Sequence, residues 1–362
     1  RILVFVHYFC LVSMSISKFL LPSLFLFCQS LSAQINPTNT AEGKDLYNKA
    51  RMYLQKADYA NSIMVYNQAI NIEPDNLLLR RELAHAYYMQ GDMAKGEKMI
   101  SPLIKNKEAD EETFQVACRI FRAMKKLDEA KSAIKTGIEK FPEAGALYAE
   151  KGELYTQEKK FALASEVWEK GVEKAPQYHI NYYNLAKVYF FTKKYIWAII
   201  YGETFVNMES FSSKTEELKR ILFESYKFLI ADLSNTALDG KVNRFENPKN
   251  FEEACLKIFD NIRGVVTGGI NAENLTQLRI RFLIDWNKNF AKVYPFELVD
   301  HQQKLLLSGN FECYNQWLCG KLDNEMFFKQ WTQKFASNMN IFDRYIRSNK
   351  LIPKNNQYYH IN

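Results

Sequence analysis

The chain has 362 residues, which is enough for one long solenoid or for two domains. Hydrophobic residues make up 47% and charged residues 25% of it, a globular composition that excludes an intrinsically disordered chain and a multispan membrane protein. The formal net charge of +7 is spread along the chain without a run of like charges, so the sequence does not indicate a nucleic acid partner.

Residues 1–33 differ in composition from the rest of the chain and hold only two charged residues. If Met14 is the start, Lys18 is followed by an apolar stretch at 19–27 and by small residues before Gln34. A charge, an apolar stretch and small residues in this order predict a secretory signal peptide over residues 1–33. We therefore expect an exported protein, most simply a periplasmic one. If the leader is retained, the protein is instead anchored in the membrane.

A pattern of aromatic and small residues returns every 34 positions between residues 43 and 212. One column of this repeat is aromatic and consists of Tyr53, Tyr87, Phe121, Tyr155 and Tyr189. A second column holds small residues and consists of Ala50, Ala84, Cys118, Gly152 and Ala186. Small residues let two antiparallel helices cross closely, and large side chains fill the space beside the crossing. The pattern therefore predicts stacked pairs of antiparallel helices.

A 34-residue repeat of two helices resembles the tetratricopeptide family. In residues 145–178 seven positions carry the residue types typical of the family: Tyr148, Gly152, Tyr155, Phe161, Ala164, Trp168 and Pro176. The resemblance implies an exported bacterial member of this family with an all-α fold, in which a right-handed solenoid of five to six helix pairs covers residues 43–232. Gly202 and Phe205 invert the usual order of large and small residues in the last copy, so we expect that copy to be distorted or packed against something else.

The repeat pattern ends after the solenoid. A polar stretch rich in Asn, Asp, Ser and Gly predicts a loop or linker over residues 233–250. Residues 251–350 are expected to be helical without the 34-residue period, as a C-terminal region that caps the solenoid or forms its own lobe. Residues 351–362 are expected to be a flexible tail.

The C-terminal region carries an aromatic helix face, since Phe327, Trp331 and Phe335 are spaced four residues apart. Packing in the core of a cap explains this face, and an aromatic docking surface is the alternative. The sequence contains no HExxH, CxxC or Walker-type motif, so we expect no enzymatic activity, no cofactor and no metal site. An envelope enzyme with an unrecognised site in residues 251–350 is the competing hypothesis.

Four cysteines follow the leader. Cys118 lies in the small column of the repeat, which predicts a buried structural thiol. Cys255, Cys313 and Cys319 are the others, and spacing alone does not decide whether any pair forms a disulfide.

In the resembled family the first helices of the pairs line a concave face, which implies a peptide-binding groove. The positions that project into this groove are Tyr47, Arg51, Arg81, His85, Tyr88, Arg119, Arg122, Tyr183, Lys187 and Phe190. Four arginines and several aromatic residues facing one channel would suit an acidic or C-terminal peptide, through charge-assisted hydrogen bonds and stacking. The carboxylate clamp of the family uses a Lys/Asn set, whereas this chain has Tyr47 and Arg51 at its first two positions.

The expected function follows from the repeats and the leader together. We expect a non-enzymatic scaffold or adaptor of the cell envelope that binds a protein or peptide in its concave groove. A membrane-tethered envelope assembly factor is the alternative, with membrane contact only if the leader is retained. The repeat pattern does not identify the partner.

Overall fold

The structure is a computed structural model that describes residues 38–238 and 245–360. The expected signal peptide at residues 1–33 lies outside the described residues. Within the described ranges every regular element is a helix and there is no strand. None of these helices combines the length and the apolar character needed to cross a membrane.

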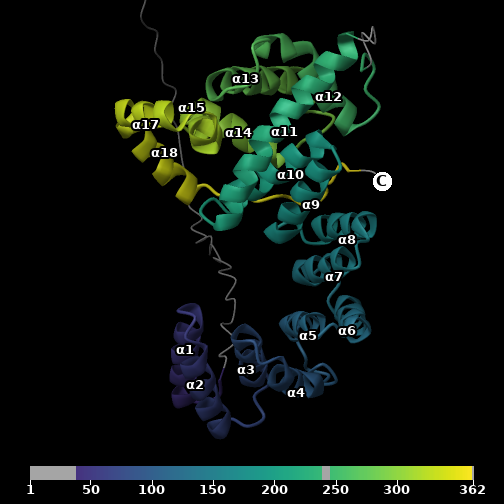
Figure 1. The fold of residues 1–362 in the computed structure, drawn as a ribbon, viewed down its shortest axis with the longest axis vertical. Coiled ribbons are helices and arrows are strands. Elements are labelled where there is room, and N and C mark those ends of the chain that lie inside the picture. Colours follow the sequence, from purple (N-terminus) through teal and green to yellow (C-terminus); the bar gives the residue numbers. More distant parts are fainter. Residues whose placement is uncertain (1–37, 239–244, 361–362) are drawn as a thin grey trace, which may run out of the picture.

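Five antiparallel helix pairs are stacked in an arc (Figure 1). The pairs are α1 (Ala41–Gln55) with α2 (Tyr59–Ile72), α3 (Leu77–Gln90) with α4 (Met93–Leu103), α5 (Glu111–Ala123) with α6 (Leu127–Lys140), α7 (Gly145–Gln157) with α8 (Phe161–Lys174), and α9 (His179–Phe191) with α10 (Tyr195–Met208). A single long helix, α11 (Ser213–Leu238), packs along α10 and continues the stack. This arrangement confirms the predicted all-α solenoid of helix pairs.

The small column of the repeat lies at the points where paired helices cross. Ala50, Ala84 and Cys118 have no exposed surface. At Gly152 a Cβ atom would overlap the indole ring of Trp168 on the partner helix α8. The Trp168 Nε1 group donates a hydrogen bond of 3.2 Å to a carbonyl of α7, which fixes the ring in this position. The alternation of small and large residues therefore determines how closely each pair packs.

The turn inside each pair has the same left-handed backbone geometry. The residues at this point are Ala57, Gly91, Lys125, Lys159 and Lys193, with φ angles of 58°, 90°, 61°, 60° and 61°. Glycine adopts this conformation freely, while a residue with a Cβ atom loses about 1 kcal/mol. The same φ angle recurs at residues that do not favour it. The packing of the two helices, and not the conformational preference of the residue, therefore determines the backbone conformation of the turn.

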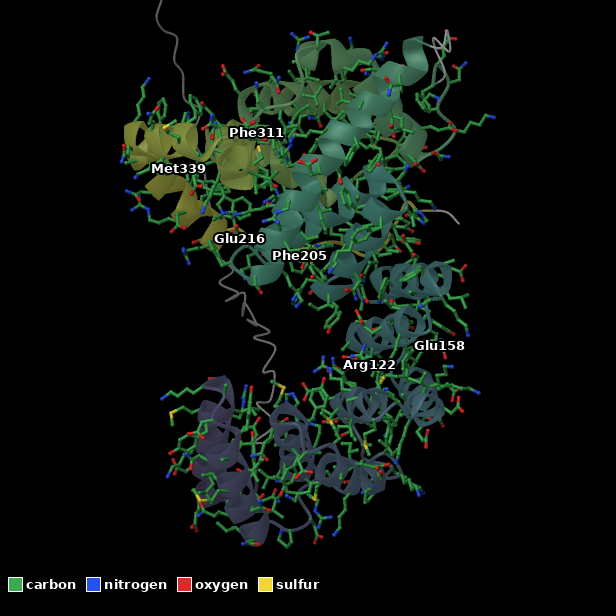
Figure 2. All side chains as sticks on the ribbon, in the orientation of Figure 1. Arg122, Glu158, Phe205, Glu216, Phe311 and Met339 are labelled. Carbon is green, nitrogen blue, oxygen red and sulfur yellow. The ribbon has the colours of Figure 1, made fainter. Side chains whose placement is uncertain are left out.

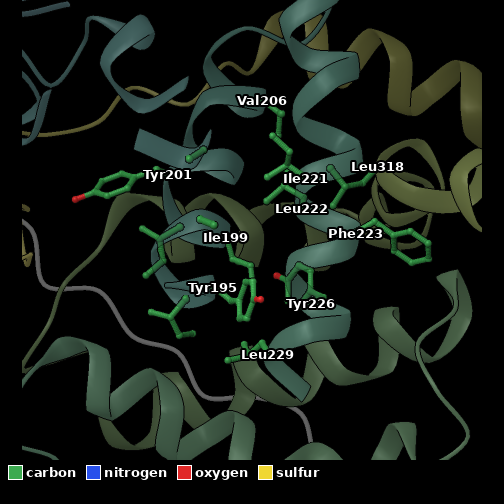
Figure 3. Packing of buried hydrophobic residues seen from close by; sticks show 14 of the residues in the cluster. Tyr195, Ile199, Tyr201, Val206, Ile221, Leu222, Phe223, Tyr226, Leu229 and Leu318 are labelled. Atoms are coloured by element: carbon green, nitrogen blue, oxygen red, sulfur yellow. The ribbon is translucent and has the colours of Figure 1, made fainter. Parts of the chain in front are cut away.

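The C-terminal helices form a cap on the solenoid. They are α12 (Phe251–Ile262), α13 (Ala272–Asn289), α14 (Glu297–Leu307), α15 (Phe311–Asn315), α16 (Lys321–Asp323), α17 (Glu325–Lys334) and α18 (Ala336–Ser348), with a 3-10 turn η1 (Arg263–Val266) and a π-helix η2 (Gln316–Gly320). One continuous hydrophobic core runs from Ala164 in α8 to Ile346 in α18. Figure 3 shows part of it, where Ile199 of α10 and Leu222 and Tyr226 of α11 lie together. Of the two expected arrangements, the structure therefore has the cap.

Two segments differ from the sequence prediction. The linker expected at 233–250 begins later, because α11 extends to Leu238 and buries Leu233 against the core. The tail expected to be flexible at 351–362 is packed over residues 351–360, where the Leu351 N–H donates to the Asn207 carbonyl at 3.0 Å. Two tyrosines account for this packing, since Tyr358 contributes to the core and the Tyr359 ring stacks on a core phenylalanine at 4.8 Å.

A buried carboxylate receives the end of this packed segment. Glu169 of α8 is 1% exposed and accepts hydrogen bonds from the hydroxyls of Tyr189 (2.6 Å) and Tyr201 (2.7 Å). His360 lies against the same group, with its Nε2 atom 3.2 Å from the Tyr189 hydroxyl. Burial raises the pKa of Glu169 and outweighs the hydrogen bonds that lower it. The segment at 351–360 is thus tied to the fourth helix pair.

A second buried carboxylate joins the cap to the last helix pair. Glu203 of α10 has no exposed surface and forms an ion pair with Arg279 of α13. Tyr226 of α11 donates to Glu203 at 2.6 Å, and Gln302 of α14 donates to the same carboxylate. Burial alone would lower the pKa of Arg279, but the charge of Glu203 and the neighbouring tyrosine hydroxyls together more than offset burial, so the pKa is raised. Four helices therefore meet at Glu203.

We expect Arg279→Met to lower the free energy of unfolding by about 3–5 kcal/mol, because it leaves the Glu203 charge buried without its cation. Urea denaturation followed by circular dichroism measures the change. Lys321→Gln is the control, since Lys321 pairs with Glu325 at the exposed surface and its loss should cost less than about 1 kcal/mol. Equal effects of the two substitutions would show that the buried pair does not hold the cap in place.

Candidate functional site

A groove of about 970 Å³ opens on the inner side of the arc. The first helices α5, α7 and α9 line it, and α8 and the start of α11 close its edges. Arg122 in Figure 2 marks its position on the inner side. We call this opening the concave groove. Its place on the first helices agrees with the groove that the tetratricopeptide resemblance implies.

A network of two arginines and two glutamates forms the polar part of the concave groove. Glu150 of α7 is 4% exposed and lies between Arg119 and Arg122 of α5. Its two oxygens lie 2.5 Å from Arg119 Nε and 3.2 Å from Arg122 Nη2, and Glu153 lies 3.3 Å from the other nitrogen of Arg122. Burial alone would lower the pKa of Arg119, but the charge of Glu150, its hydrogen bond and two nearby tyrosines together more than offset burial, so the pKa is raised. The arginine charges are therefore compensated within the chain.

Two lysines flank one tyrosine at the other end of the concave groove. Lys187 lies 2.8 Å from Glu217 and 4.9 Å from the centre of the Tyr183 ring. Lys214 lies 5.2 Å from the centre of the same ring. Within the described residues Lys214 forms no ion pair, although its charge still interacts with that of Glu217. The positive charge of Lys214 is therefore compensated less closely than the charges of Arg119 and Arg122.

The apolar part of the concave groove has two exposed phenylalanines. Phe191 is 74% exposed at the end of α9, and Phe161 is 50% exposed at the start of α8. The sequence prediction placed Phe190 in the groove, but its ring instead packs against Phe228 at 6.2 Å. The sequence missed Phe161, Phe191 and Glu150. The helical period gives only approximately the direction in which a side chain projects from the helix axis. It therefore did not show which of Phe190 and Phe191 faces the groove.

The predicted groove residues of the first two helix pairs lie outside the concave groove. Arg81 is 3% exposed and is surrounded by Glu82, Asp110 and Glu112. It is therefore a buried ion-pair residue and not an open anion site. The remaining predicted residues of this part are Tyr47, Arg51, His85 and Tyr88.

These remaining residues form two ring contacts. The Tyr47 ring is largely buried and lies 5.5 Å from the Arg51 guanidinium. His85 stacks on Tyr88 at 6.3 Å, and burial lowers the pKa of His85. Tyr88 also lines a shallower opening of about 410 Å³ together with Arg119. This opening extends the concave groove toward α3.

Within the described residues, no three His, Cys, Asp or Glu side chains are placed so that they could hold a metal ion. The cysteines of the described ranges are all buried free thiols: Cys118, Cys255, Cys313 and Cys319. Burial raises the pKa of Cys118, which keeps that thiol protonated. The prediction that Cys118 is a buried structural thiol is confirmed.

Comparison with known proteins supports the tetratricopeptide interpretation of the repeats. A family profile described as "TPR repeat" matches residues 50–91. Among curated proteins, the antiviral innate immune response effector IFIT1 of Homo sapiens is 24% identical over 149 residues, which cover 35% of this chain and 31% of the relative. Protein IFIT1 homolog B of Homo sapiens is 28% identical over 96 residues, or 26% of this chain and 20% of the relative. The chain spans less than a third of the length of these relatives.

Solved structures with a similar arrangement include helical repeat proteins. The alignment with TTC0263, a TPR protein of Thermus thermophilus, covers 50% of this chain and 98% of TTC0263, with 12% identity and a TM-score of 0.45. A tetratricopeptide repeat protein from Parabacteroides merdae covers 74% and 100%, with 14% identity and a TM-score of 0.39. A human IFIT1 dimer with m7Gppp-AAAA covers 68% and 64%, with 16% identity and a TM-score of 0.36.

We expect Glu150→Gln to lower the free energy of unfolding by about 1–3 kcal/mol, because Arg119 and Arg122 lose their shared buried acceptor charge. Urea denaturation at low and high salt measures this change. Glu153→Gln is the matched control in the same helix, where the partly exposed pair should contribute less than about 1 kcal/mol. A Glu150→Gln variant as stable as the parent would contradict a structural role for the network.

Proposed function

We propose that the protein is a non-enzymatic scaffold that holds a segment of another protein in the concave groove. The observation that carries this proposal is the exposure of Phe191 and Phe161 inside the groove. An exposed aromatic ring in a concave site loses contact with water when an apolar side chain packs on it, and such rings dominate many protein interfaces. The repeat family supports this function, since tetratricopeptide solenoids are interaction scaffolds.

The charge of the groove refines the expected partner. The sequence suggested an acidic peptide, on the basis of four arginines facing the channel. Arg81 is buried, and Arg119 and Arg122 share Glu150, so these cations are already satisfied. A mixed apolar and polar segment with a single acidic group, placed at Lys214, suits the groove better than a strongly acidic one.

Nucleic acid is the competing partner, because a human IFIT1 structure contains m7Gppp-AAAA. Binding of a phosphate chain depends on cations that replace its counterions. In this groove Arg119, Arg122 and Lys187 are paired with carboxylates. This pairing favours a protein partner over RNA, and the experiment below includes RNA as an outcome.

We further propose that the protein is exported and acts in the cell envelope, most simply in the periplasm. Support comes from the order of charge, apolar stretch and small residues in residues 1–33. In this proposal the mature protein begins at Gln34. Sequencing of the mature N-terminus tests it, and a retained leader would favour the membrane-tethered assembly factor.

Partner binding in the concave groove is tested by replacing Phe191 with a photo-crosslinking amino acid in the cells that make the protein. We expect a defined protein to be crosslinked there, and Phe191→Asp to reduce its capture at least tenfold, or by about 1.4 kcal/mol. Phe191 is 74% exposed, so the substitution should leave helicity and the unfolding midpoint unchanged.

Leu163 provides the matched control for this experiment. It is 40% exposed on α8 and does not line the concave groove. A crosslinker at Leu163 should not capture the same protein, and Leu163→Asp should change capture by less than twofold. Equal capture from both positions, or a crosslinked product that ribonuclease removes, would overturn the proposal of a protein partner in the groove.

A further inference from the structure

A second opening lies in the cap, away from the concave groove. It measures about 470 Å³ and is enclosed by α13, α14, α15 and α17 with the π-helix η2. Figure 1 shows α15 and α17 side by side at one end of the cap, and Phe311 in Figure 2 marks the inner wall. We call this opening the cap pocket. The proposed scaffold function makes no use of it.

Aromatic rings form much of the wall of the cap pocket. Phe311 and Trp331 are buried at 2% and 9% exposure, Phe335 is half-buried, and Phe327 is 48% exposed at the mouth. Three of these rings come from the aromatic helix face that the sequence singled out. Core packing explains Trp331, whereas the exposure of Phe327 leaves a ring face open to a ligand. An aromatic wall can hold an organic cation through its π faces.

The charges at the cap pocket all have one sign. Glu273 of α13 and Glu312 of α15 are both exposed and line it, while no Lys, Arg or His is among its lining residues. Within the described part of the chain, neither glutamate forms an ion pair. Lys334 lies 5.3 Å from the centre of the Phe335 ring without lining the pocket. In a chain with a net charge of +7, this pocket is a local acidic site.

The π-helix η2 contributes a polar side chain to the wall of the same pocket. Gln316 is 3% exposed, lines the pocket and begins η2. Its Oε1 atom is buried against Gly320, where a Cβ atom would overlap it. The amide therefore shapes the wall of the pocket, and π-helices often occur at functional sites.

We propose that the cap pocket binds an arginine side chain of a partner protein. The guanidinium group stacks on aromatic rings, pairs with carboxylates and donates several hydrogen bonds from one plane. The cap pocket supplies these partners: the rings of Phe327 and Trp331 for stacking, and the exposed carboxylates of Glu273 and Glu312 for charge pairing and hydrogen bonds. A purely apolar ligand would leave the two carboxylates without a counter-charge, and an acidic ligand would meet two like charges.

The test uses the full chain and two short peptides, one with an arginine between two leucines and one with citrulline in place of arginine. Citrulline keeps the shape of arginine and removes its charge. Saturation-transfer NMR titrations should show binding of the arginine peptide and at least tenfold weaker binding of the citrulline peptide. No binding of the arginine peptide at millimolar concentration, or equal binding of the two peptides, would overturn the proposal.

Variants assign the binding to the cap pocket. The double substitution Glu273→Gln with Glu312→Gln should weaken binding of the arginine peptide about tenfold, and both side chains are exposed, so the fold should be unaffected. Glu325→Gln is the control, because Glu325 is an exposed carboxylate of α17 outside the pocket. Phe191→Asp in the concave groove should leave this binding unchanged, which separates the outcome from that of the proposed scaffold function. Loss of binding in either of the last two variants would place the peptide elsewhere.

Discussion

The ion pair between Glu203 and Arg279 determines how the solenoid ends. A helical repeat stack exposes an apolar face at each end and needs a cap to cover it. Here the last second helix, α10, carries a fully buried carboxylate, and the cap brings the arginine that neutralises it. Neither charge is stable alone in this interior, so α10 and the cap must fold against each other. The last helix pair is therefore part of the cap as much as of the repeat.

This junction makes the two ends of the concave groove different. On the cap side, α8 to α11 share one hydrophobic core with the C-terminal helices, and Glu169 contacts His360 of the packed segment at 351–360. The first helix pairs have smaller separate cores. Neighbouring repeats in a solenoid contact mainly each other, so relative motion accumulates away from a fixed end. The groove is thus anchored at Phe191 and can adjust at the side of α3.

The sequence predicted the repeat because helix packing requires the same residue types at the same places in each pair. The sequence did not predict which side chains of neighbouring repeats pair with each other. Small residues such as Gly152 and Ala84 are required wherever two helices cross, so the period is visible without a structure. Gly202 and Phe205 broke the pattern, and the structure shows why: Gly202 lies against Leu222 of α11. The compensation of Arg119 by Glu150 depends on how neighbouring pairs are rotated, which no single repeat encodes. Because the sequence does not give this rotation, the sequence prediction placed Phe190 in the groove instead of Phe191.

The concave groove and the cap pocket differ in how far their charges are compensated, and the fold explains this difference. In the solenoid, equivalent positions of successive first helices lie side by side, so a basic residue on one repeat is readily neutralised by an acidic one on the next, as Arg122 and Glu153 show. Selectivity there must come from shape and from exposed rings. In the cap the helices do not repeat, and Glu273 and Glu312 face an opening with no basic lining residue. Of the two sites, the cap pocket therefore has the stronger electrostatic preference, and the concave groove adds the weaker preference of Lys214.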